Sequence, residues 1–175
     1  DPNVRKINAH ITKKVADKLE EIFKTDRKGF EEKWESLGLF VKYGMMTDDK
    51  FLEKAGKFHI MKTVSTDTFY TLEEYRTATE ALQKNKEGKL VLLYSTQPEQ
   101  QNTFIKAAEN KGYKVLQFDT MVDAAFISHM EMKWENVQFK RVDADIADNL
   151  IDKQDEIKSV LTDDEVNQLK ELFNI

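Results

Sequence analysis

Apolar residues in the first part of the chain recur every three or four positions, which is the period of an α-helix. The first stripe has charged residues on its opposite face and predicts an amphipathic helix; it consists of Val4, Ile7, Ile11, Val15, Leu19, Ile22 and Phe23. After a break at 25–29, Phe30, Trp34 and Leu37 predict a second helix, and 39–43 either prolong it or form a short extended piece. A third short helix begins at 47–49 and ends at Gly56, so residues 1–56 are predicted to form a helical subdomain.

From residue 57 the pattern changes to short apolar runs that alternate with helical segments. The central stretch 89–119 contains two such runs joined by a segment of helical length, which predicts a parallel βαβ unit. Strands that are apolar throughout are typical of sheets covered by helices on both faces. The remaining strands are predicted at 57–63 and, as an outer strand, at 137–142. Residues 57–145 are therefore predicted to form a small three-layer α/β/α domain with a mostly parallel sheet.

The end of the chain is strongly acidic. Residues 143–175 contain seven Asp, three Glu and three Lys, a charge of −7, which leaves the rest of the chain at +2 in a total of −5. We interpret residues 146–175 as an acidic linker followed by a C-terminal helix that opens at the capping box Thr162–Glu165.

Composition excludes several classes of function. The chain has no cysteine and therefore no thiolate chemistry, and a sequence pI near 5.4 argues against a nucleic-acid binder. Neither an apolar run long enough for a membrane span nor an N-terminal signal is present in the sequence. We interpret the chain, which has apolar residues at its very end and no initiator Met, as an excised piece of a larger protein.

The turns after the strands lack the glycines that bring backbone close to a phosphate, so we expect no nucleotide site. A crevice near Ser95, Thr96 and Asp119 is the place for an alternative function, a stand-alone phosphotransfer or interaction module. A phospho-accepting Asp119 needs a second acidic cluster to hold a divalent cation, and 61–63 contain no carboxylate. A helix-capping Asp119 is the preferred interpretation.

The three histidines, His10, His59 and His129, fall on different predicted elements, so neither a metal site nor a catalytic residue is predicted. Phe126, Met130 and Trp134 recur at helical spacing. They either pack in the core or form an apolar, adaptable surface for partner chains.

Several long stretches resemble one protein family in order and with few gaps. They are VRKINAHITKKVADKLEEIF, FEEKWESLGLFVKYGMMTD, TLEEYRTATEALQKNKEGKLVLLYS and NKGYKVLQFDTMVDAAF. Together they resemble the middle segment of the heat-shock protein 90 chaperones in their bacterial form, over residues 1 to about 145. The tail from Thr162 then resembles the start of the dimerisation domain.

The resemblance implies a protein whose ATP and Mg bind in an amino-terminal domain outside this chain, with the arginine that reaches the γ-phosphate upstream of Asp1. It implies no cofactor and no catalysis in the chain itself. The implied role is to connect the ATPase and dimerisation domains of a cytoplasmic homodimer and to contribute to the binding of unfolded clients. Phe126, Met130 and Trp134 are the candidate client contacts. A plain interaction scaffold with one defined partner is a further alternative.

Overall fold

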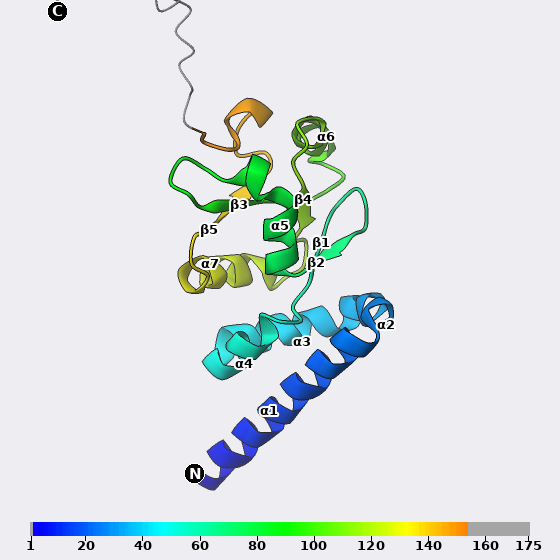
Figure 1. Ribbon diagram of the computed structural model, residues 1–175, viewed down its shortest axis with the longest axis vertical. Coiled ribbons are helices and arrows are strands. Elements are labelled where there is room, and N and C mark those ends of the chain that lie inside the picture. The colour runs from blue at the N-terminus through cyan, green and yellow to red at the C-terminus, as the bar shows by residue number, and fades with distance from the viewer. Residues whose placement is uncertain (1, 154–175) are drawn as a thin grey trace, which may run out of the picture.

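A computed structural model describes residues 2–153 of the chain (Figure 1). Its first part is a layer of four helices, α1 (Pro2–Thr25), α2 (Arg27–Glu32), α3 (Trp34–Thr47) and α4 (Asp49–Ala55). The stretch 39–43, which was open to two interpretations, lies within α3 and prolongs the helix. The helical subdomain predicted from the spacing of apolar residues is therefore confirmed.

Short polar side chains start two of these helices. The Asp26 carboxylate accepts a hydrogen bond from the Gly29 N–H at 2.9 Å at the start of α2. The Asp48 carboxylate accepts from the N–H groups of Lys50 and Phe51 at the start of α4. These carboxylates satisfy backbone N–H groups that have no partner inside the helix, which explains why the chain turns at these points.

The second part is a parallel sheet of three strands with helices on both faces. Strands β3 (Leu90–Ser95), β4 (Val115–Gln117) and β5 (Val137–Arg141) pair in the order β4-β3-β5. The predicted βαβ unit is confirmed: α6 (Asn102–Asn110) joins β3 to β4, and Gly112 takes a φ of +81° where the chain leaves the helix. Helices α5 (Leu72–Gln83) and α7 (Asp123–Lys133) complete the unit, and a capping box formed by Thr71 and Glu74 starts α5.

The predicted first strand at 57–63 is wrong in extent and in sheet. Only β1 (Met61–Lys62) is extended, and it pairs antiparallel with β2 (Phe69–Tyr70), touching β4 through a bridge between Thr63 and Leu116. The residues before β1 are buried between the helical layer and the sheet. Their apolar side chains therefore fill the space between two layers. In a sequence, an apolar run with this role looks the same as an apolar run that forms a strand.

Alternate residues of β3 face the two sides of the sheet. Val91 and Leu93 pack with Ile105 and Ala108 of α6. Leu90 and Leu92 belong to a larger cluster on the other side, which includes Tyr75 of α5 and Phe126 of α7. The predicted three-layer arrangement is therefore present: α6 forms the first layer, the sheet the second, and α5 and α7 together the third.

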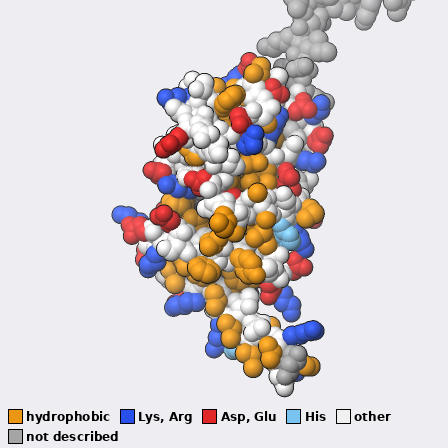
Figure 2. Space-filling view, turned by 180° about the vertical axis from the view of Figure 1, so that it is seen from behind, with side chains coloured by type: hydrophobic (Ala, Val, Ile, Leu, Met, Phe, Trp, Pro, Cys, Tyr) orange, Lys and Arg blue, Asp and Glu red, His pale blue; other side chains and the backbone are white. Residues whose placement is uncertain are grey.

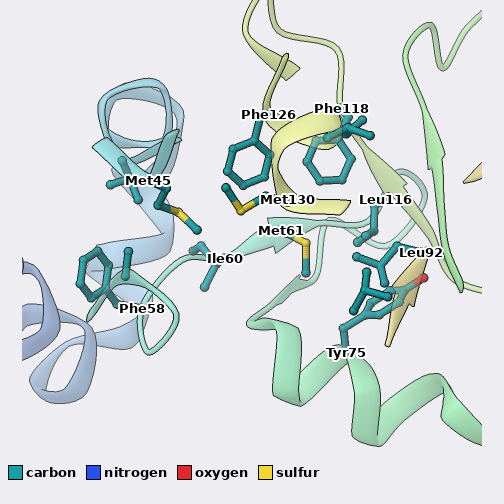
Figure 3. Close-up of a cluster of buried hydrophobic side chains, with 14 of the residues drawn as sticks. Met45, Phe58, Ile60, Met61, Tyr75, Leu92, Leu116, Phe118, Phe126 and Met130 are labelled. Carbon is teal, nitrogen blue, oxygen red and sulfur yellow. The ribbon is translucent and has the colours of Figure 1, made fainter. Parts of the chain in front are cut away.

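One hydrophobic core continues from the helical layer into the α/β unit. Figure 3 shows Met45 of α3 in the same cluster as Phe118, Phe126 and Met130, together with Phe58 and Ile60 from the connection between α4 and β1. All six side chains are at most 2 % exposed. The two parts therefore share one packed interior.

On the α6 side, the core extends beyond residue 145. The short 3₁₀ helix η1 (Ala147–Asn149) is followed by Leu150 and Ile151, which are buried against the α6 side of the sheet. The boundaries at 56 and 145 stay predictions, and the C-terminal helix expected from Thr162 lies outside the described residues.

Candidate functional site

The crevice proposed for phosphotransfer has its hydroxyl already engaged. Ser95 is fully buried, and its Oγ donates to Gln101 Oε1 at 2.7 Å. The same oxygen accepts from the N–H groups of Thr96 and Gln97, both at 3.1 Å, so Gln101 organises the turn after β3. The contacts of Gln101 account for the conformation of this turn. They also engage the Ser95 hydroxyl, which is therefore not free to take part in phosphotransfer.

Asp119 is exposed at the end of β4, and its Oδ2 accepts from the Gln117 side chain at 2.7 Å. The prediction that it caps a helix is wrong. The carboxylate that bonds to backbone at the start of α7 is Asp123, whose Oδ2 accepts from the Thr120 N–H at 2.9 Å. The spacing Thr120-x-x-Asp123 is half of a capping box, so this residue had a sequence signal that the prediction missed.

No group of three His, Asp or Glu side chains within residues 2–153 gathers as a possible metal site. His10 is exposed on α1, and His129 lies on α7. His59 is in the interior, between the helical layer and α7, and its Nε2 has no hydrogen-bond partner among the described residues.

His59 lies in a box of aromatic rings. Its imidazole is centred 5.5 Å from Trp34, 5.1 Å from Phe126 and 6.1 Å from Trp134. Burial, with a smaller contribution from the positive charge of Lys42, lowers the pKa of His59 from 6.5 to about 3. The side chain is therefore neutral at physiological pH and acts as one more ring of the interlayer core.

A buried ion pair joins the two layers beside this box. Lys42 Nζ, on α3, donates to Asp123 Oδ1, on α7, at 2.5 Å, and the two side chains are 9 % and 2 % exposed. The ammonium also lies 5.1 Å from the centre of the Phe118 ring and 5.7 Å from that of Phe126. Such a pair holds α3 against α7 because either charge alone is costly in the core.

The three candidate client contacts do not share one environment. Phe126 and Met130 are fully buried, 0 % exposed, and Figure 3 shows both in the central cluster. Trp134 is partly exposed and lines a pocket of about 320 Å³ with Leu52, Leu72 and His59. Core packing, the alternative interpretation, describes Phe126 and Met130 in this structure, whereas client contact stays a prediction.

Large apolar side chains are exposed elsewhere, at positions that the sequence analysis assigned to no partner. On α3, Leu39, Phe40 and Tyr43 are 45 %, 72 % and 63 % exposed, and Met121 before α7 is 96 % exposed. Figure 2 shows hydrophobic side chains gathered over the middle and lower part of the face seen from behind.

A groove of about 500 Å³ opens beside α3, between the helical layer and the carboxyl end of β4. One wall comes from α2 and α3, the other from β1, Phe69 and residues 117–120. We call it the acidic groove because five carboxylates line it, those of Glu31, Glu32, Glu35, Asp119 and Asp123. No sequence signal pointed to it, since its walls are far apart along the chain.

These observations define the class of protein. It is a mixed α/β domain with a helical layer fused to one side of its sheet. The model of the family described as Hsp90 protein matches residues 2–175. The chain is 49 % identical over 173 residues to the chaperone protein HtpG of Porphyromonas gingivalis, and 48 % identical over 161 residues to that of Bacteroides thetaiotaomicron. The chain belongs to the Hsp90 family.

The alignments cover 99 % and 92 % of this chain but 25 % and 24 % of those relatives, so the chain spans about a quarter of their length. Among solved structures, the middle domain of a putative heat shock protein of Plasmodium falciparum matches with a TM-score of 0.62 and 16 % identity. That match covers 81 % of this chain and 58 % of the other, and it shows that the fold is that of an Hsp90 middle domain. The predicted family and fold class are confirmed.

Proposed function

We propose that the chain is the middle segment of an ATP-dependent chaperone, where it is a rigid connector between an ATPase domain and a dimerisation domain and one wall of the site for unfolded clients. The continuous core between the helical layer and the α/β unit carries this proposal. A segment that passes motion between two domains must move as one body, and a shared core fastened by a buried ion pair has that property.

In this proposal ATP and Mg belong to the parent protein outside the chain, the parent is a cytoplasmic homodimer, and its partners are partly folded proteins. Family membership supports this assignment. No helix within residues 2–153 is both long and apolar enough to cross a membrane.

The test compares the chain alone with the full-length chaperone at equal concentration. We expect ATP hydrolysis by the full-length protein only, and suppression of the aggregation of a heat-unfolded client to be stronger for the full-length protein. Turnover by the chain alone, lost in Asp119→Asn, would contradict the proposal. Labelling of Asp119 by acetyl phosphate, absent in the same variant, would instead favour the phosphotransfer module.

A further inference from the structure

The acidic groove has more negative charge than its surroundings neutralise. Glu31 pairs with Arg27 at 2.6 Å, and Asp123 pairs with Lys42 at 2.5 Å. The remaining lysine of the lining, Lys62, pairs with Asp67 outside the groove.

Three carboxylates of the lining remain without a cationic partner among the described residues: Glu32, Glu35 and Asp119. All three are exposed. They come from both walls, Glu32 and Glu35 from the helical layer and Asp119 from the end of β4. Like charges that line one cleft focus a negative potential in it, so the groove favours a positively charged occupant.

A single divalent cation does not fit this arrangement. Within residues 2–153 no three carboxylates or imidazoles converge closely enough to hold a metal ion. The complementary charge must therefore be distributed over several points, as on a polypeptide with successive basic side chains.

The walls also offer apolar surface. Phe69 is partly buried, and Leu39 is 45 % exposed at the groove. Tyr43 follows Leu39 by one helical turn, and Phe40 is next to Leu39 in the sequence. The apolar surface of α3 therefore continues past the groove. Figure 2 shows hydrophobic side chains gathered on one face of the lower part of the molecule.

We propose that the acidic groove binds an extended polypeptide segment in which Lys or Arg alternates with large apolar residues. The basic side chains lie against Glu32, Glu35 and Asp119, and the apolar ones against Leu39 and Phe69. The inference rests on the proposed client-binding function, since it names the chemistry of the client segments that the chain selects. A volume of about 500 Å³ accepts a few side chains of such a segment and excludes a folded domain.

The test measures binding of a fluorescein-labelled twelve-residue peptide of alternating Lys, Leu and Ser to the chain by fluorescence anisotropy. The groove variant is Glu32→Gln/Glu35→Gln/Asp119→Asn. The matched control is Glu80→Gln/Glu99→Gln/Glu135→Gln, which removes the same charge at exposed residues that do not line the groove. Urea unfolding of each variant verifies that the fold is kept.

We expect the groove variant to weaken binding by about tenfold or more and the control to change it less than about twofold. Leu39→Ser should weaken binding as well, and a peptide with Glu in place of Lys should not bind. Equal weakening by both triple variants, or tight binding of the acidic peptide, overturns the proposal.

The same variants in the client-aggregation assay separate the two proposals. Full protection by the groove variant, together with unchanged peptide binding, would remove the groove as a site and leave the chaperone function standing. Absence of protection in wild-type full-length protein would remove the chaperone function, whatever the peptide result.

Discussion

Removing one partner of the Lys42–Asp123 pair leaves a charge in the core without compensation. We expect Lys42→Met to lower the free energy of unfolding by about 3 kcal/mol. Asp123→Asn, added to Lys42→Met, should restore much of this loss, because the amide oxygen still accepts from the Thr120 N–H. Urea unfolding of the wild type, both single variants and the double variant measures the coupling. Additive losses would show that the pair does not stabilise the contact between α3 and α7.

His59 predicts a dependence of stability on pH. Its pKa is about 3 in the folded chain and about 6.5 in the unfolded chain, so between these values only the unfolded state binds the proton. Stability should therefore fall as pH falls below 6.5, with a slope from this residue that rises toward about 1.4 kcal/mol per pH unit as the unfolded state becomes fully protonated. Urea unfolding between pH 5 and 6.5 measures the slope. That window lies above the ordinary range of the carboxyl groups whose pKa is lowered by ion pairs, such as Glu74 beside Arg27.

The matched variants are His59→Phe and His10→Gln. His59→Phe should remove the part of the slope of stability against pH that one proton causes, whatever its effect on absolute stability. His10→Gln should keep this slope, because His10 is exposed on α1. An unchanged slope in His59→Phe would mean that His59 is protonated in the folded protein.

The sequence showed only part of the site. Lys42 and Asp123 are 81 positions apart, and nothing in their local patterns links them. The same holds for Glu32, Glu35 and Asp119, which meet at a groove only because the helical layer packs against the sheet.

The two halves of α1 contribute differently to stability. Val4, Ile7, Ile11 and Val15 are each about half exposed, whereas Leu19, Ile22 and Phe23 pack against the core. We expect Ile22→Ala to lower the free energy of unfolding by about 2 kcal/mol. Ile11→Ala should change it by less than about 0.5 kcal/mol, since little packing is lost and Ala favours helix. Equal losses in urea unfolding would show that the first half of α1 is also packed.

Elements with local signals were predicted best. The long helical stripe and the βαβ unit around 89–119 both correspond to observed elements. The strand expected at 57–63 failed because its residues are apolar for another reason, the filling of the space between the layers. Only tertiary packing distinguishes these two cases.

In the whole molecule, we expect the helical layer and the α/β unit to move as one body. Introduced cysteines can be labelled selectively within this segment, because its 175 residues contain no cysteine. Lys28, on α2, and Lys106, on α6, are exposed positions on the two parts and have no ion-pair partner among the described residues. Both are suited to replacement by cysteine and spin labelling.

The most direct measurement is the distance between labels at Lys28→Cys and Lys106→Cys within one protomer of the full-length chaperone, by double electron–electron resonance, without nucleotide, with ADP and with a non-hydrolysable ATP analogue. Mixing with an excess of unlabelled protein leaves one labelled protomer in each dimer, so that distances between protomers do not contribute. A second pair, Lys28→Cys with a label in the ATPase domain, reports whether the protein changes conformation. We predict one narrow distance for the first pair in all three states while the second pair shifts. A second distance, or a shift in the first pair, would show instead that the helical layer and the α/β unit move separately.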